Sequence, residues 1–252
     1  MIEAIDLTKR YEDGILALDH LNLKVAPGEI FCLLGANGAG KSTAINLMLN
    51  FIEPTEGTAK INDIDVTREP LEAKKYVAYL SENVSLYGNF TARQNLEFFA
   101  GLAGKQTDLD GYYKVLRRVG LPENAFEKRI KEFSKGMRQK VGIAIVIIRD
   151  ARAVIMDEPT SGLDPQAGAE FLHLLEELRG EGRAVFMSTH DIFRARTLAD
   201  RVGIMKSGRL ISERTRQELE YEDLEELYLD YMYGTNTGRD KIENPLVRQE
   251  PQ

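Results

Sequence analysis

Apolar and polar residues alternate along the first 25 residues of the chain. Leu21, Leu23 and Val25 form one such series, and a period of two places its members on the same face of a strand. Alternating runs lie on either side of Glu12-Asp13-Gly14, where the acidic residues and the glycine favour a turn. The pattern therefore predicts antiparallel strands at the N-terminus.

Further along, the alternation gives way to short, unbroken apolar runs. Residues 30–34 form the first of them. Later runs predict strands at 153–156, 184–188 and 202–205. An unbroken apolar run is typical of a strand that is buried on both faces of a parallel sheet. Residues 166–179, between two of these strands, repeat leucines at helical spacing. Strands that alternate with helices in this way predict the α/β fold class.

Two other segments have a different character. Strand signals disappear over about 84–150, where helical patterns predict a helical lobe inserted into a domain that spans 1–212. Residues 216–233 combine apolar residues at helical spacing with a strongly acidic face, which predicts a C-terminal amphipathic helix in the segment 213–233. This helix either docks on the core or binds a partner. Residues 234–252 are polar and are expected to form a flexible tail.

Composition narrows the possible functions. The 252 residues carry a net charge of −7, which argues against nucleic-acid binding through a general positive field. A single cysteine, Cys32, lies in a buried apolar run and forms no disulfide within the chain, which fits a reducing compartment. The N-terminus lacks the apolar region of a signal peptide, and the apolar stretch 141–148 is too short to cross a bilayer. We therefore expect a cytoplasmic protein, and any membrane association is expected to come through a partner.

The segment 35–43 reads GANGAGKST and fits the phosphate-binding pattern G-x-x-x-x-G-K-[ST]. It follows the apolar run at 30–34 and precedes residues 44–49, which read as the first turns of a helix. In this context the glycines let the backbone curl around a phosphate, while successive N–H groups and the positive end of the helix dipole face it. The chain is therefore predicted to bind a nucleoside triphosphate. The candidate binding residues are Gly35, Asn37, Gly38, Gly40, Lys41, Ser42 and Thr43.

Hydrolysis also requires a carboxylate for the metal ion and a group that activates water. The apolar run 153–156 ends in Asp157 and Glu158. Asp157, at the tip of the strand, is placed to reach Mg²⁺, to which Ser42 offers its hydroxyl. Glu158 is placed to polarise the attacking water as a general base. The alternative, an ordinary strand followed by an acidic turn, is disfavoured because a phosphate loop lies upstream.

Further motifs make a family resemblance specific. Residues 157–165 read DEPTSGLDP and resemble the Walker B motif and D-loop of ABC-type ATPases. Residues 133–140, FSKGMRQK, resemble their signature motif, usually written LSGGQ, and STHD at 188–191 resembles the strand end that carries their switch histidine. Tyr11 stands where the family places an aromatic residue that stacks on adenine. The order and spacing match from Ile2 to about Leu227.

The resemblance implies a composite site with ATP and Mg²⁺ as its cofactors. In the family, two copies, or two homologous subunits, face each other head to tail and sandwich two ATP molecules. Ser134 and Gly136 of one copy are then expected to close over the ATP held by the phosphate loop of the other. His190 is expected to contact the γ-phosphate and to hold Glu158 and Asp164 in register. The implied fold is a P-loop NTPase (RecA-like) core with a mixed sheet, an N-terminal antiparallel β subdomain and an inserted helical lobe.

The chain departs from the family pattern at two places. Glu82 stands where the family commonly has a glutamine that bonds Mg²⁺ or the lytic water. Its carboxylate is expected to take that role toward the metal and in the reaction. Because the carboxylate is charged, the occupancy of the metal site is expected to depend more strongly on pH and on the Mg²⁺ concentration. The signature motif has Lys135 and Met137 where Gly and Gln are usual, and Lys135 is expected to add positive charge near the phosphates of the opposite copy. This form resembles the ATPase subunits of ABC-2-type exporters.

The leading functional hypothesis is the ATPase subunit of an ABC transporter, peripheral on the cytoplasmic face of the membrane and paired with an integral-membrane subunit. In this hypothesis ATP binding closes the dimer, hydrolysis reopens it, and this chain does not bind the transported substrate, which the sequence does not identify. The alternative is an ABC-type ATPase in a soluble assembly, such as one for cofactor or cluster biogenesis. Ribosome-associated members normally carry two such domains in one chain, and DNA-repair members carry long coiled coils; this sequence has neither feature.

Overall fold

The computed structural model describes residues 1–233, so the tail predicted at 234–252 lies outside the described residues. The strands, in chain order, are β1 (Ile2–Arg10), β2 (Leu16–Val25), β3 (Ile30–Leu34), β4 (Glu56–Ile61), β5 (Ile64–Asp65), β6 (Val77–Leu80), β7 (Ala153–Asp157), β8 (Ala184–Thr189), β9 (Arg201–Lys206) and β10 (Arg209–Thr215). The α-helices are α1 (Lys41–Met48), α2 (Pro70–Ala73), α3 (Ala92–Leu102), α4 (Leu109–Arg118), α5 (Lys135–Ile148), α6 (Pro165–Gly180), α7 (Ile192–Leu198), α8 (Arg216–Tyr221) and α9 (Leu224–Tyr233). Short 3₁₀ turns lie at Glu123–Ala125 and Ile130–Glu132.

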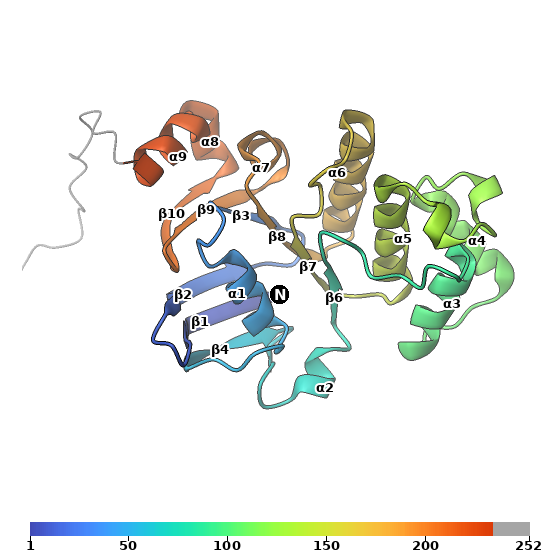
Figure 1. Ribbon diagram of the computed structural model, residues 1–252, viewed down its shortest axis with the longest axis horizontal. Coiled ribbons are helices and arrows are strands. Elements are labelled where there is room, and N and C mark those ends of the chain that lie inside the picture. The colour runs from blue at the N-terminus through green and yellow to red at the C-terminus, as the bar shows by residue number, and fades with distance from the viewer. Residues whose placement is uncertain (234–252) are drawn as a thin grey trace, which may run out of the picture.

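The strands form two sheets. The first sheet is antiparallel and has the order β2-β1-β4-β5; the alternating pattern of residues 1–25 predicted its β1–β2 pair. The second sheet has the order β10-β9-β3-β8-β7-β6, in which β10 alone is antiparallel to its neighbour. Figure 1 shows the antiparallel sheet at one end of the molecule and the green helical lobe at the other. The predicted mixed sheet, antiparallel β subdomain and helical lobe are therefore confirmed.

The central sheet is buried on both faces. Phe31 and Leu33 of β3 face a core that β3 shares with α1 and the antiparallel sheet, and Phe31 stacks on Phe186 with ring centroids 6.0 Å apart. The alternate residues of β3, including Cys32, face a second core that α5, α6 and α7 cover. This two-sided burial explains why the strand reads as an unbroken apolar run. Burial also raises the pKa of the Cys32 thiol, so the side chain is a neutral core residue.

The helical lobe consists mainly of α3, α4 and α5. Each of these helices begins at a polar residue whose side chain accepts a hydrogen bond from a backbone N–H of the first turn: Thr91, Asp108 and Ser134 respectively. Their apolar faces continue the core beneath the central sheet, so the lobe packs as one body with α6. Among the described residues, no helix is both long enough and apolar enough to cross a membrane.

The C-terminal segment differs from its prediction. Instead of one helix over 216–233, the chain forms α8 and α9, because Glu222 has extended backbone angles and ends α8. Leu224 of α9 is buried in the core, and Lys206 of β9 donates hydrogen bonds to carbonyls in the last turn of α9. These contacts show a segment docked on the core. The elements β5, α2 and α7 were also absent from the sequence prediction.

Candidate active site

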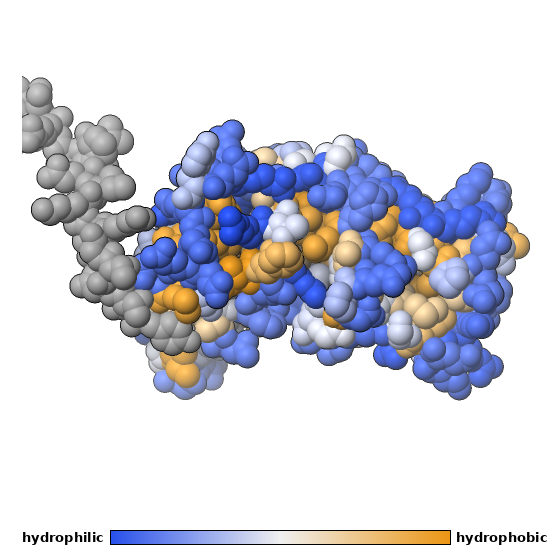
Figure 2. All heavy atoms as spheres, turned by 90° about the horizontal axis from the view of Figure 1, so that it is seen from above, coloured by the Kyte–Doolittle hydropathy of each residue, from blue (hydrophilic) through white to orange (hydrophobic). Residues whose placement is uncertain are grey.

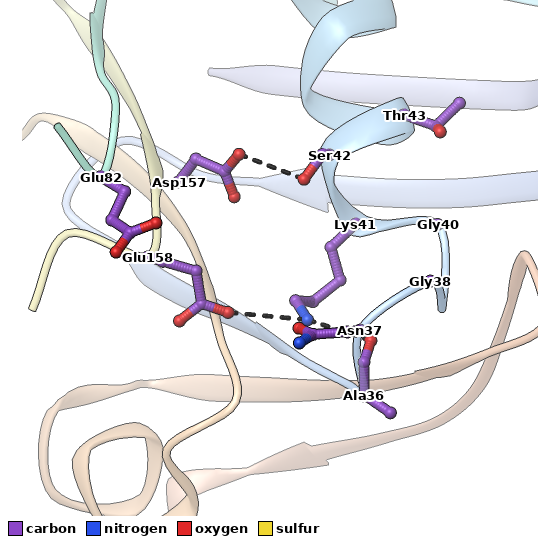
Figure 3. A pocket seen from close by; sticks show the side chains of 10 residues that line it. All are labelled: Ala36, Asn37, Gly38, Gly40, Lys41, Ser42, Thr43, Glu82, Asp157 and Glu158. Carbon is purple, nitrogen blue, oxygen red and sulfur yellow. Dashed lines mark hydrogen bonds and ion pairs between the residues drawn. The ribbon is translucent and has the colours of Figure 1, made fainter. Parts of the chain in front are cut away.

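Neighbouring strands deliver the candidate residues to one edge of the central sheet. The loop after β3 carries the phosphate-binding motif, β7 ends at Asp157, and β8 pairs Ser188 with Asp157. Because the carboxyl ends of parallel strands meet at one edge, these segments converge although they lie far apart in sequence. The phosphate loop and the end of β7 line a pocket of about 290 Å³, drawn in Figure 3. Its lining residues are Ala36, Asn37, Gly38, Gly40, Lys41, Ser42, Thr43, Glu82, Asp157 and Glu158.

The phosphate loop turns tightly into α1. Gly38 and Gly40 have φ angles of 80° and 110°, which L residues with a side chain rarely adopt. A Cβ on Gly40 would also lie 2.6 Å from the carbonyl oxygen of Ala17, so only glycine fits at that position. No side chain caps α1, in contrast to α3 through α7, and its first turn holds no acidic residue. The N–H groups and the dipole of α1 are therefore available to an anion in the pocket.

Lys41 extends from the first turn of α1 across the loop. Its side chain is 6% exposed, and Nζ donates hydrogen bonds to the carbonyl oxygens of Gly35 (2.5 Å) and Ala36 (3.2 Å). Nζ also lies 3.6 Å from Oε1 of Glu158. A dashed line marks this ion pair in Figure 3. These contacts hold a buried cation at the pocket, where it is positioned to pair with phosphate oxygens.

A chain of hydrogen bonds joins α1, β7 and β8. Ser42 Oγ donates to Asp157 Oδ2 at 3.2 Å, and Ser188 Oγ donates to Asp157 Oδ1 at 2.6 Å. Asp157 is therefore held with one oxygen toward the hydroxyl of Ser42. The described residues contain no group of three or more His, Cys, Asp or Glu side chains that could hold a metal ion alone. A hydroxyl and one carboxylate instead fit Mg²⁺, which usually keeps several waters and takes other ligands from phosphates.

Glu158 has an unusual backbone conformation. Its φ angle is 46°, in the left-handed region that is sparsely populated by residues other than glycine. The turn is fixed by its neighbours, since the Glu158 N–H donates to the carbonyl oxygen (3.2 Å) and Oγ (3.1 Å) of Ser188. Its Oε2 lies 2.9 Å from Nδ1 of His190 and accepts a hydrogen bond from the His190 N–H at 3.3 Å. The structure thus brings together the proposed base and the switch histidine, on the ends of adjacent strands.

Glu82 lies in the loop after β6, on the far side of the pocket from the phosphate loop, and lines the pocket. Lys135 Nζ, at the start of α5, lies 3.3 Å from Glu82 Oε1. Hydrogen bonding by Ser161 and Lys135 holds the pKa of the Glu82 carboxyl below its usual value. Two of the three residues that depart from the family pattern, Glu82 and Lys135, are therefore paired with each other within one chain. The sequence placed Lys135 near the phosphates of the opposite copy and did not predict this pair.

The remaining candidates lie outside the residues that line the pocket. Tyr11 follows β1, is 39% exposed and has the Lys9 ammonium 5.4 Å from its ring centroid. Ser134 caps α5 through a hydrogen bond from the Met137 N–H at 3.2 Å, and a Cβ on Gly136 would lie 3.0 Å from the Cβ of Ala167. Asp164 caps α6 by accepting from the Ala167 N–H at 2.8 Å. Each of these residues thus has a local structural role within the chain.

The sequence analysis missed Ala36 and Ser188 at the site. Ala36 contributes its carbonyl oxygen to Lys41, a role that any residue type could fill, so the sequence carries no signal for it. Ser188 binds the Asp157 carboxylate, and the signal for this contact is its position at the end of a predicted strand, two residues before His190. Recognising it requires knowing that β7 and β8 are neighbours.

Known proteins resemble this chain in sequence. A family model described as ABC transporter matches residues 18–161. The bacitracin transport ATP-binding protein BcrA of Bacillus licheniformis is 36% identical over 88% of this chain and 74% of its own length. The phosphonates import ATP-binding protein PhnC 2 of Synechococcus is 31% identical over 98% and 97% respectively. The probable multidrug ABC transporter ATP-binding protein YbhF of Escherichia coli is 35% identical over 87% of this chain, which spans only 38% of YbhF.

Solved structures agree with the sequence relatives. An ATP-binding subunit of an ABC transporter superimposes with a TM-score of 0.81 at 30% identity, over 91% of this chain and 98% of that one. The ATP-binding cassette MJ0796, in a dimeric post-hydrolysis state bound to ADP and Pi, superimposes with a TM-score of 0.77 at 27% identity, over 86% and 99%. With a phosphate loop and an Asp-Glu strand end lining one pocket, and with His190 in contact with Glu158, the chain belongs to the ABC transporter family and is an ABC-type ATPase.

Proposed function

We propose that this chain binds Mg-ATP in the pocket of Figure 3 and hydrolyses it between two head-to-tail copies. The observation that carries the proposal is the N-terminus of α1, which has neither a capping side chain nor an acidic residue in its first turn and lies beside the buried ammonium of Lys41. A pocket of about 290 Å³ suits the phosphate end of a nucleotide, and it leaves the base to lie outside, toward Tyr11.

In this proposal, each residue has a distinct task. Ser42 and Asp157 hold the magnesium ion, which neutralises charge on the phosphates when it is bound. Lys41 pairs with the β- and γ-phosphates, and Glu158 accepts a proton from the attacking water while His190 fixes its orientation. Three further candidates do not line the pocket of their own chain: Ser134, Gly136 and Asp164. In this proposal they serve the site of the opposite copy when the dimer closes. The dimeric MJ0796 structure shows that related cassettes pair.

The load of this ATPase is proposed to be an integral-membrane subunit that docks on the helical lobe. Tyr87, Phe90, Phe98 and Phe99 form an aromatic cluster there, with neighbouring ring centroids 4.8–5.4 Å apart. Three of these rings are 36–49% exposed, although aromatic side chains are usually buried. Figure 2 also shows hydrophobic residues at the surface over the lobe. An exposed aromatic surface of this kind is typical of a protein interface.

Substituting Phe90 with glutamate tests the docking surface. We expect Phe90→Glu to abolish co-purification of the membrane subunit and ATP-driven transport, because it places a charge in an apolar contact. Basal ATP hydrolysis should stay within about twofold of the parent, since the residue touches no pocket group. Leu71→Glu, at a more exposed apolar residue on α2, is the control for placing a charge on an apolar surface residue and should retain the subunit. Loss of basal hydrolysis in Phe90→Glu alone would contradict a docking role.

Affinity purification of tagged Glu158→Gln with Mg-ATP from detergent-solubilised membranes of the native organism tests the proposed function as a whole. A polytopic membrane protein recovered in stoichiometric amount supports a transporter subunit on the cytoplasmic face. Recovery of soluble assembly factors alone supports the second candidate, a non-transport assembly. The signature motif with Lys135 favours export, whereas the relatives include an import protein. Transport assays in inverted vesicles with the recovered subunit therefore test the direction of transport.

Two substitutions separate a metal-binding role of Glu82 from a purely structural one. We propose that Glu82 assists magnesium binding and that its ion pair with Lys135 competes with this role. Glu82→Gln should then raise the Mg²⁺ concentration that gives half-maximal hydrolysis, while Lys135→Gln, which frees the carboxylate, should lower it. A partly exposed ion pair is worth little, so each shift should be about two- to fivefold.

The measurement is a Mg²⁺ titration of hydrolysis at fixed, saturating ATP. Shifts in opposite directions support metal binding by Glu82. Shifts in the same direction and of equal size would show that Glu82 acts only as the partner of Lys135. Lys128→Gln, an exposed lysine on the same lobe, is the control for the loss of one positive charge and should leave the titration unchanged.

A further inference from the structure

Arg194 joins the two segments that carry Glu158 and His190. It lies on α7, four residues after His190, and its side chain is only 19% exposed. One guanidinium nitrogen (NH1) donates to the carbonyl oxygen of Thr160 at 2.6 Å, and Nε lies 3.0 Å from Oδ2 of Asp191. Thr160 is buried and lies two residues after Glu158, while Asp191 directly follows His190. A single planar guanidinium therefore bonds both segments at once.

These bonds close a ring of contacts around the proposed base. Glu158 bonds His190, Asp191 follows His190 and pairs with Arg194, and Arg194 bonds Thr160, which leads back to Glu158. The ring matters because the φ angle of Glu158 is 46°, a conformation that persists only where the surroundings fix it. Ser188 fixes the N-terminal side of Glu158 through its N–H. On the other side, the Ser161 N–H donates to the Glu158 carbonyl oxygen at 3.1 Å, and Arg194 links Thr160 to the segment that carries His190.

The neighbouring helix leaves room for this arginine. A Cβ on Gly168, in the first turns of α6, would lie 3.2 Å from a terminal nitrogen (NH2) of Arg194. The helical conformation of Gly168 does not require glycine, because its φ angle is not positive. Alanine would therefore favour the helix, yet it would crowd the guanidinium. The glycine is explained by the space that Arg194 occupies.

We propose that Arg194 is a positioning residue that holds Glu158 and His190 in register for hydrolysis, an inference that rests on the proposed function. Arg194 does not line the pocket, and its printed hydrogen bond and ion pair go to Thr160 and Asp191, so it acts through these two residues. A small misplacement of a catalytic group lowers the rate of the chemical step. Loss of Arg194 should therefore lower kcat and leave nucleotide binding unchanged.

The test compares Arg194→Met and Arg194→Lys with the exposed neighbour Arg196→Met. Arg194→Met, which keeps the packing but removes every donor, should lower kcat about tenfold with KM for Mg-ATP and the melting temperature nearly unchanged. Arg194→Lys should recover only part of this loss, because its ammonium can pair with Thr160 or Asp191 but does not bridge both as the guanidinium does. Arg196→Met should match the parent. A parental kcat in Arg194→Met, or parallel losses in KM and melting temperature, would overturn the proposal.

Gly168→Ala provides a readout that a merely structural role does not move. In the parent it should raise the melting temperature yet lower kcat by about two- to threefold, because the methyl group displaces the guanidinium. In the Arg194→Met background it should leave kcat unchanged; an equal loss in both backgrounds would overturn the proposal. Glu158→Gln is measured in parallel. If it retains parental turnover, the proposed site fails; if it loses turnover while Arg194→Met does not, only this inference fails.

Discussion

Glu158→Gln is expected to lower the rate of ATP hydrolysis by about two to four orders of magnitude, the usual contribution of a general base. The amide keeps the size of the side chain but cannot accept a proton from water. The contact with the His190 N–H survives, because an amide oxygen also accepts a hydrogen bond, so the local structure should persist. Steady-state phosphate release measures the effect. Glu226→Gln, at an exposed glutamate of α9, is the control for removing one negative charge.

The same variant should accumulate as a dimer in Mg-ATP. Slow hydrolysis leaves ATP in both sites, and the neutral amide removes a negative charge that faces the γ-phosphate. Size-exclusion chromatography with light scattering should therefore show a dimer with Mg-ATP and a monomer after EDTA removes the metal. A monomer of Glu158→Gln at saturating Mg-ATP contradicts the head-to-tail model, even if hydrolysis is lost.

Lys41→Ala is expected to weaken ATP binding by about 10- to 100-fold, since hydrogen bonds to charged groups contribute about 1.5–3 kcal/mol. The Lys41 side chain is 6% exposed and lines the pocket, so its charge acts on a bound phosphate with little screening by water. ATP affinity in the presence of Mg²⁺, measured by calorimetry, tests this expectation. Lys128→Ala, an exposed lysine outside the pocket, should bind ATP as the parent does.

Removing Lys41 also has a consequence without nucleotide. The carbonyl oxygen of Gly35 loses the Nζ donor, that of Ala36 keeps only the Ala39 N–H, and the Glu158 carboxylate loses its ion pair with Lys41. We expect a lower melting temperature in the absence of ATP, because the Gly35 acceptor loses its hydrogen bond. Lys41→Arg retains the charge but not the fit, so it should restore much of the stability and little of the affinity. Unchanged ATP affinity in Lys41→Ala would rule out the proposed phosphate contact.

The fold class could be predicted because the spacing of apolar residues within a short stretch of sequence shows whether that stretch is a strand or a helix and which of its faces are buried. The alternating N-terminal strands and the apolar run of β3 read directly as one-sided and two-sided burial. The prediction was weaker where apolar spacing continues across a local break. Residues 216–233 have one helical pattern, but the extended backbone of Glu222 divides them into α8 and α9. Periodicity reports which side chains face the core and is insensitive to such a break.

The sequence by itself determined the phosphate loop, the Asp157-Glu158 strand end and the family, because each is a contiguous motif whose residues share one local backbone. Only the tertiary structure decided which distant side chains meet. Ser188 binds Asp157 across 31 residues, Arg194 binds Thr160 across 34, and Lys135 pairs with Glu82 across 53. These contacts depend on β7 lying between β8 and β6, and on how α5 and α7 pack against that edge. Strand order and helix packing minimise the exposed apolar area of the whole chain, and no single segment encodes them.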